Sequence, residues 1–270
     1  MPDLSIEQLQ QTAYTAAWRA GQIVRDNYAK PKNVRQKKGP RDLVTDTDGA
    51  AQEAALTAIQ EQYPNHTILA EEAPSVQPDE HGTWPIPPGV VWAVDPLDGT
   101  TNYTTGLPFV CVSVGVAIDR EPVVGVIYDP LREEAIVAGR GLGESLNGQP
   151  LSPLPPTSLI ESVAAVDWSH APETREQMVR VVLALSRHCR TVRALGSAAL
   201  AMAYVACRRV QLYANFGLQP WDTCAAAAII QATGGELWQP DGGLWQFGEP
   251  ALITGHPKLL ADALRMIEAR

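Results

Sequence analysis

The sequence has few positive charges and no long apolar segment. Lys and Arg number 21 against 30 Asp and Glu, which gives a formal net charge of −9. An acidic chain is a poor partner for nucleic acid, and no uninterrupted apolar run reaches the roughly 18 residues of a membrane span. The first residues, MPDLSIEQLQ, show no basic segment followed by an apolar one. We therefore expect a cytoplasmic protein that binds neither nucleic acid nor membranes.

Cysteine and histidine are scarce and scattered. The four cysteines form no C-x-x-C pair, and the five histidines show no metal-binding spacing. This pattern excludes a zinc site and a disulfide framework. We expect four reduced thiols in the core, at Cys111, Cys189, Cys207 and Cys224.

Hydrophobic patterning predicts an α/β protein made of packed layers of sheet and helix. Helices are expected over residues 6–28, 49–62, 173–186, 197–208 and 221–232, with a last helix from Pro257. Strands are expected over residues 66–70, 90–95, 162–166, 191–195 and 210–216, and residues 110–151 predict an antiparallel meander. The chain divides near residue 152 into halves 1–151 and 152–270 of one compact unit.

A basic segment separates the first two helices. Residues 30–41 carry six basic side chains and no acidic one, and Pro31, Gly39 and Pro40 predict a loop. The default interpretation is a solvated loop. The alternative is a mobile lid in which Lys37 or Lys38 faces an anionic site.

The strand over residues 90–95 ends on carboxylates. Asp95 and Asp98 are three residues apart and lead directly into a Gly-Thr-Thr turn. Carboxylates this close repel each other and resist burial, so we expect a bound cation between them. Pro96 is predicted to end the strand ladder, which lets both carboxylates and the Leu97 carbonyl point into one cavity.

Further acidic residues also lie at the ends of predicted elements, namely Asp48, Glu71, Glu72 and Asp222. Oxygen-only ligands suit Mg²⁺, Mn²⁺ or Ca²⁺, and a carboxylate that bridges two cations fits two-metal phosphoryl hydrolysis. Consecutive N–H groups at the 99–101 turn predict a phosphate-binding nest at a helix start. Asp222 is predicted to be both a helix N-cap and a ligand.

Four motifs resemble those of the inositol monophosphatase-like phosphatases. They are DLVTDTD (42–48), AEE (70–72), DPLDGTTNY (95–103) and PWDTCAAAAIIQATGG (220–235), in the same order across nearly the whole chain. The resemblance implies a layered αβαβα sandwich of the inositol monophosphatase and fructose-1,6-bisphosphatase type. It also implies two or three Mg²⁺ ions, for which Mn²⁺ can substitute, as well as lithium sensitivity and a homodimer.

The same resemblance implies a role for each site residue. The metal ligands would be Glu71, Asp95, the Leu97 carbonyl, Asp98 and Asp222. Asp48 and Thr100 would orient and activate the attacking water. The phosphate would lie in the turn formed by Gly99, Thr100 and Thr101. The alcohol of the substrate would contact Asp98, Ala198, Asn215 and Gln219.

One departure from the family pattern bears on the substrate. Inositol-preferring members usually carry a glutamate where this chain has Asn215. We expect hydrolysis of a small soluble phosphate monoester, with myo-inositol monophosphate or a related polyol or sugar phosphate as the leading candidate. Histidinol phosphate, fructose 1,6-bisphosphate and 3′(2′),5′-bisphosphate nucleotides are alternatives. A non-catalytic regulator that binds metal or a phosphometabolite is a further alternative, against which the retention of Asp48 and Thr100 argues.

Overall fold

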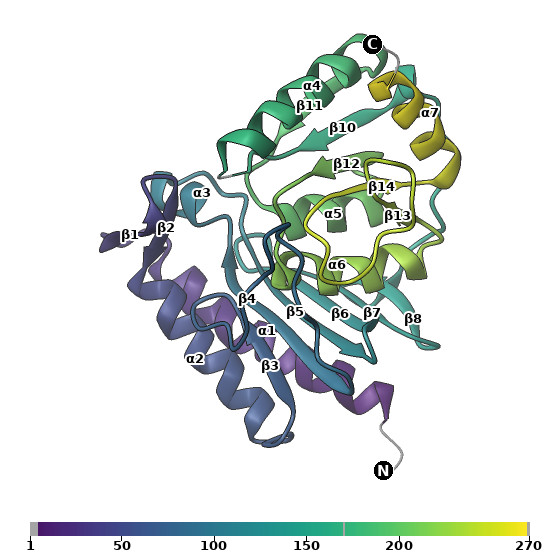
Figure 1. Cartoon of the computed structure of the whole chain (residues 1–270). Coiled ribbons are helices and arrows are strands. Elements are labelled where there is room, and N and C mark those ends of the chain that lie inside the picture. The colour runs from purple at the N-terminus through teal and green to yellow at the C-terminus, as the bar shows by residue number, and fades with distance from the viewer. Residues whose placement is uncertain (1–4, 170, 269–270) are drawn as a thin grey trace.

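A seven-stranded sheet forms the centre of the N-terminal half (Figure 1). The computed structural model describes residues 5–169 and 171–268, without the side chain of Lys38. The sheet consists of β3 (Thr67–Ala70), β4 (Val90–Asp98), β5 (Cys111–Ile118), β6 (Glu121–Asp129), β7 (Glu134–Gly139), β8 (Gly143–Leu146) and β9 (Gln149–Pro150), in that spatial order. β3 runs parallel to β4, and the remaining pairs are antiparallel. The predicted meander is therefore confirmed.

Helices cover both faces of this sheet. On one face lie α1 (Ile6–Asn27) and α2 (Asp46–Gln60), and on the other lie α5 (Ala198–Ala206) and α6 (Pro220–Ala232). α6 comes unusually close to the sheet because two glycines face it. A Cβ atom at Gly125 would lie 2.1 Å from the Ala225 carbonyl oxygen, and one at Gly115 would lie 2.6 Å from the Ala225 nitrogen.

A second sheet lies beyond α5 and α6. It has the order β11 (Thr191–Ala194), β10 (Val163–Val166), β12 (Leu212–Asn215), β14 (Leu252–Gly255) and β13 (Glu236–Trp238). Its outer face is covered by α4 (Pro172–His188) and α7 (Pro257–Glu268), next to the short 3₁₀ helix η1 (Leu159–Glu161). The sequence of layers is helix, sheet, helix, sheet, helix (Figure 1). The predicted αβαβα sandwich is confirmed.

The loop predicted over residues 30–41 is wrong in its central part. β1 (Val34–Gly39) and β2 (Asp42–Thr45) pair as an antiparallel hairpin, which lies beside α3 (Thr100–Thr105) (Figure 1). Gly39 and Pro40, which predicted a loop, form the turn that connects the two strands of the hairpin.

α2 also begins earlier than predicted, at Asp46. Thr45 caps it, because the Thr45 hydroxyl accepts a hydrogen bond from the Thr47 N–H (3.2 Å) and Asp48 Oδ2 accepts one from the Thr45 N–H (2.9 Å). This capping box places the Asp48 carboxylate in the first turn of the helix.

The prediction that Pro96 ends the strand ladder is wrong. β4 continues to Asp98, which pairs with Cys111 after an irregularity in register that follows Asp95. The irregular segment accommodates the missing proline N–H, and the Leu97 N–H donates a hydrogen bond to Asp95 Oδ1 (2.9 Å). Both carboxylates therefore lie within one strand.

The described residues include no helix that is both long and apolar enough to cross a membrane.

Candidate active site

Four carboxylates gather at one edge of the large sheet. β3 and β4 are parallel, so Glu71, which follows β3, lies at the same edge as Asp95 and Asp98 at the end of β4. Asp222 enters from the first turn of α6. Burial raises the pKa of Asp95 well above its ordinary value, and the nearby charges of the other three carboxylates raise it further. The cluster therefore disfavours its own ionisation unless a cation is present.

The pKa values of the other members rise for the same reason. Burial raises the pKa of Asp222 well above its usual range, and the charge of Asp98 adds to this effect. Burial also raises the pKa of Glu71 to about 7, although the neighbouring Lys37 ammonium opposes the shift. Asp95 and Asp98 are only 3% and 8% exposed, so water contributes little to stabilising their charges.

Asp98 connects the two halves of the protein. Its Oδ2 accepts hydrogen bonds from the Ser197 hydroxyl (2.6 Å) and the Ala199 N–H (2.7 Å), and its Oδ1 accepts one from the Ala198 N–H (3.2 Å). These donors form the start of α5, where a negative charge is favourable. The contact also places the backbone of Ala198, predicted to lie beside the substrate alcohol, directly at Asp98.

Asp222 occupies a different helix position from the one predicted. The N-cap of α6 is Gln219, and Asp222 is the third helical residue, whose Oδ2 accepts a hydrogen bond from the Gln219 N–H (2.7 Å). The prediction that Asp222 is the N-cap is wrong because Pro220 takes the first position of the helix, which suits a residue without an N–H.

Lys37 of the hairpin reaches the acidic cluster. Its Nζ lies 2.7 Å from Glu71 Oε1 and 2.6 Å from Glu72 Oε1. Although burial alone would lower the pKa of Lys37, the two carboxylates raise it above its ordinary value. The side chain of Lys38, the other candidate for a lid contact, lies outside the described part of the structure.

Asp48 and Thr100 form a hydrogen-bonded pair next to this cluster. The Thr100 hydroxyl lies 3.1 Å from Asp48 Oδ1 and 3.2 Å from the Leu97 carbonyl oxygen, both of which can accept its proton. The other Asp48 oxygen, Oδ2, accepts from the Thr45 hydroxyl (2.5 Å) as well as the Thr45 N–H. Burial raises the pKa of Asp48, and the hydrogen bonds from Thr45 and Thr100 partly oppose this.

The Gly99 turn has room for glycine alone. Gly99 has φ +95°, in the left-handed region, and a Cβ there would lie 3.0 Å from the Gly196 carbonyl oxygen. Gly99 is the N-cap of α3, so the N–H groups of Thr100 and Thr101 are in the first turn of that helix, where N–H groups have no intrahelical acceptor.

The predicted alcohol-binding amides already have partners within the protein. Asn215 is 5% exposed; its Nδ2 donates to the Tyr213 hydroxyl (3.2 Å), and its Oδ1 accepts from the Gly217 N–H (3.1 Å). Gln219 Oε1 accepts a hydrogen bond from the Trp84 indole N–H (2.7 Å). Both amides are thus held in fixed orientations at the ends of β12 and α6.

Comparison with known proteins identifies the family. The model of the Inositol monophosphatase family matches residues 5–269. The chain belongs to this family. Inositol monophosphatase 1 of Solanum lycopersicum is 33% identical over 270 residues, covering 98% of this chain and 97% of the relative. Nus factor SuhB of Escherichia coli (strain K12) is 34% identical over 254 residues, covering 93% and 92%.

Solved structures agree with this assignment. The extragenic suppressor protein suhB of Bartonella henselae superposes with a TM-score of 0.87 at 27% identity, covering 97% of this chain and 98% of that one. Inositol monophosphatase from Anabaena superposes with a TM-score of 0.82 at 28% identity, covering 97% and 96%.

The inositol monophosphatase family is metal-dependent, and the donor set of this member fits a hard divalent cation. The four carboxylates at the edge of the large sheet all offer oxygen, and their raised pKa values come mainly from burial and mutual repulsion. In the described residues no three Asp, Glu, His or Cys side chains already stand in ligating geometry. The hydrogen bonds explain this, because Lys37 holds Glu71 and the start of α5 holds Asp98.

Sequence reasoning missed three residues that shape the site of this family member. Ser197 donates to Asp98, and Asn102 Nδ2 donates to the Leu195 carbonyl (2.7 Å) and so joins the Gly99 turn to the start of α5. Asp167 follows β10; its Oδ1 accepts from the Gly196 N–H (2.5 Å), and its buried Oδ2 has no hydrogen-bond partner among the described atoms. Burial raises the pKa of Asp167 to about 7.

Proposed function

We propose that this protein hydrolyses a small soluble phosphate monoester, with water as the nucleophile and Mg²⁺ as the cofactor. The observation that carries the proposal is the Asp48–Thr100 hydrogen bond beside four closely spaced, mutually repelling carboxylates. Such a cluster repels a phosphate dianion in the absence of metal, whereas it binds divalent cations well.

We propose the same metal ligands that the family resemblance implies. Glu71, Asp95 and the Leu97 carbonyl would hold one ion, and Asp95, Asp98 and Asp222 would hold a second, with a weaker third near Glu71. Asp95 is the proposed ligand common to both main sites. The charges of all three neighbouring carboxylates raise its pKa. When bound, Mg²⁺ or Mn²⁺ would neutralise the phosphate charge and lower the pKa of the attacking water.

Asp48 and Thr100 would act on the attacking water as a relay. Because the Thr100 hydroxyl donates its proton to Asp48 Oδ1, its oxygen lone pairs can accept a hydrogen bond from water. Thr45 holds the opposite oxygen of Asp48, so Oδ1 keeps its direction toward Thr100. The Thr100 oxygen would take the proton that the water loses, while the Thr100 hydroxyl proton would pass to Asp48 Oδ1, whose raised pKa suits it to accept one.

Backbone groups would hold the phosphate. Gly99 permits the close approach that the turn needs, and the N–H groups of Thr100 and Thr101 can donate to phosphate oxygens. We propose that the hairpin of β1 and β2 acts as a lid over the phosphate site, since Lys37 of this hairpin already reaches Glu71.

The region around the leaving alcohol favours a permissive enzyme. Asn215 is neutral and already hydrogen-bonded to Tyr213 and Gly217. It would therefore accept a weaker hydrogen bond from a polyol hydroxyl than a carboxylate would. The relative SaIMPase-II has been solved bound to inositol monophosphate (TM-score 0.77, 26% identity) and to 2′AMP (TM-score 0.79, 28% identity). We therefore propose that myo-inositol monophosphate is one of several substrates that this protein accepts.

The remaining properties are proposed as the composition, the N-terminal residues and the family resemblance predict them. We propose a cytoplasmic, lithium-sensitive homodimer that binds neither nucleic acid nor membranes. Phosphatases for histidinol phosphate, fructose 1,6-bisphosphate or 3′(2′),5′-bisphosphate nucleotides are the second candidates. A non-catalytic regulator is disfavoured, because binding alone does not require the Asp48–Thr100 pair.

A substrate panel tests this proposal. We expect the wild type to hydrolyse inositol 1-phosphate with kcat/KM within about tenfold of the other phosphomonoesters. Asn215→Glu should sharpen inositol preference by roughly five- to tenfold, since a charged acceptor strengthens a hydrogen bond by about 1 kcal/mol. Asn215→Gln, which stays neutral, is the matched control. A strong wild-type preference for inositol phosphate would contradict the assignment of Asn215.

A further inference from the structure

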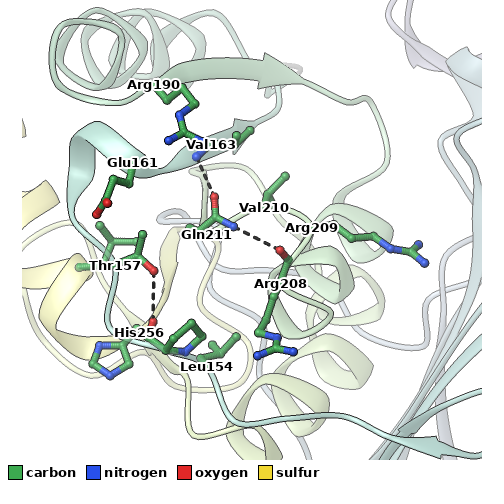
Figure 2. Close-up of a pocket in the computed structure, with 12 residues that line it drawn as sticks. Leu154, Thr157, Glu161, Val163, Arg190, Arg208, Arg209, Val210, Gln211 and His256 are labelled. Carbon is green, nitrogen blue, oxygen red and sulfur yellow. Dashed lines mark hydrogen bonds between the residues drawn. The ribbon is translucent and has the colours of Figure 1, made fainter.

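The C-terminal half contains a pocket built from residues outside the acidic cluster. Its volume is about 480 Å³, which lies in the range of small-molecule sites. The chain before η1, the turn that precedes β12 and the start of α7 form its walls (Figure 2). None of its lining residues is a proposed ligand of metal or phosphate.

Arg208 contributes an unpartnered charge to this pocket. Its φ of +58° lies in the left-handed region, which is uncommon for a residue other than glycine and therefore calls for an explanation. Its N–H donates to the Val205 carbonyl (2.9 Å), and its carbonyl accepts from Gln211 Nε2 (3.2 Å), so the backbone is held on both sides. Its guanidinium group forms no ion pair or hydrogen bond with any residue that the structure describes.

The charges around the pocket leave a positive excess. Arg209 does not contribute, because its guanidinium group is paired with both carboxylate oxygens of Glu134 (2.5 and 2.6 Å). Figure 2 shows Arg190 at the top of the view, Arg208 to the lower right and His256 to the lower left, so the three side chains stand apart around the pocket. Glu161 is the acidic side chain of the lining, and its pKa is lowered by hydrogen bonds with Ser158 and by the charge of Arg190.

The floor of the pocket is fixed and partly apolar. Gln211 Oε1 accepts a hydrogen bond from the Val163 N–H (2.8 Å) while Nε2 binds the Arg208 carbonyl, so both ends of this amide are used. Apolar side chains surround it, namely Leu154, Val163, Val210 and Leu259. The pocket therefore has charged side chains at its edges and an apolar surface between them.

We propose that this pocket is a second ligand site, which binds a small organic phosphate. The phosphate would lie against Arg208, because a guanidinium fork donates two parallel hydrogen bonds to phosphate oxygens. The carbon part would cover the apolar floor. In a protein of net charge −9, such a site recruits an anion that most of the surface repels.

Calorimetric titration with phenylphosphonate tests the proposal. This probe carries a non-hydrolysable phosphonate and an apolar ring, and it is titrated into the full chain in the presence of Mg²⁺. We expect one binding event to weaken about tenfold or more in Arg208→Gln, because a charge-assisted fork is lost. Arg208→Lys should lose less, since it keeps the charge. Arg190→Gln provides a second variant at the opposite edge.

Controls separate this site from the acidic cluster. Arg187→Gln, at an exposed arginine of α4 outside the pocket, should leave all binding unchanged. Asp95→Asn should weaken only the event at the acidic cluster, and Arg208→Gln should keep its hydrolytic rate and unfolding temperature. The proposal is overturned if no binding event responds to either Arg208→Gln or Arg190→Gln, however many events the wild type shows.

Discussion

Replacing Lys37 by methionine tests whether its ammonium group holds the place of a metal ion. Lys37 Nζ bridges Glu71 and Glu72 at 2.7 and 2.6 Å, and the Lys37 and Glu71 side chains are 19% and 21% exposed. Under the proposed ligand assignment, Mg²⁺ competes with this ammonium group for the Glu71 carboxylate. The substitution removes the competitor and leaves the carboxylates without a cation.

The magnitude follows from the burial of these groups. Removing one partner of a fully buried ion pair destabilises a protein by roughly 3–5 kcal/mol, and the residual exposure here reduces this to about 2–3 kcal/mol. For a chain of this size the loss corresponds to roughly 4–10 °C in unfolding temperature when metal is chelated. Saturating Mg²⁺ should restore most of it. The same 2–3 kcal/mol limits how much more tightly Lys37→Met can bind Mg²⁺ than the wild type does. The upper limit is a gain in affinity of about 100-fold, and we expect a gain of at least about fivefold.

The assay is thermal unfolding over a Mg²⁺ titration at pH 8, combined with calorimetry for Mg²⁺ affinity. Lys258→Met, at an exposed lysine of α7, is the matched control and should change neither quantity. Unchanged or weaker Mg²⁺ binding in Lys37→Met would refute the assignment of Glu71 as a ligand for which Lys37 competes.

Two further predictions concern the water-activating pair and a buried acid. Thr100→Ala and Asp48→Asn should each lower kcat more than they raise KM, because neither change removes the backbone N–H groups of the phosphate turn. The double variant should be about as slow as the worse single one, and additive losses in steady-state kinetics would count against a shared role. Asp167 has a folded-state pKa of about 7, raised from 3.8 by burial, so its favourable contribution is complete below about pH 4 and is lost as the pH rises through 7. Asp167→Asn should therefore gain up to about 4 kcal/mol in stability over the wild type at pH 8 but only about 1.5 kcal/mol at pH 5, and denaturant unfolding that gives the reverse order would contradict this.

Local signals made most of the fold predictable. The period of apolar residues located α1, α4, α5, α6 and the meander to within a few residues, because burial of one face sets those patterns. The hairpin of β1 and β2 was missed because most of its strand residues are polar or charged, and because Gly39 and Pro40 in its turn are also typical of loops. The earlier start of α2 was available in the sequence, where Thr45 and Asp48 have capping-box spacing. The division into halves 1–151 and 152–270 stays a prediction.

The site was predictable only where its residues are neighbours in sequence or belong to a motif. Asp95 and Asp98 stand together in the chain, whereas the Asp48–Thr100 contact spans 52 residues and was expected from the family resemblance alone. Ser197 lies 99 residues from Asp98, and no local pattern marks a serine whose partner is that distant. The engagement of Asn215 with Tyr213 and Gly217 depends on the exact path of the chain after β12, which periodicity does not specify.

Metal dependence of turnover tests the central claim most directly. The measurement is the initial rate of phosphate release from a generic phosphomonoester after exhaustive chelation and again after Mg²⁺ is added back. Asp26→Asn, at an exposed aspartate of α1, serves as the control for Asp95→Asn. We predict no turnover without metal, full recovery with Mg²⁺ in the wild type and in Asp26→Asn, and no recovery in Asp95→Asn. Full activity after chelation, or normal recovery in Asp95→Asn, would contradict the account.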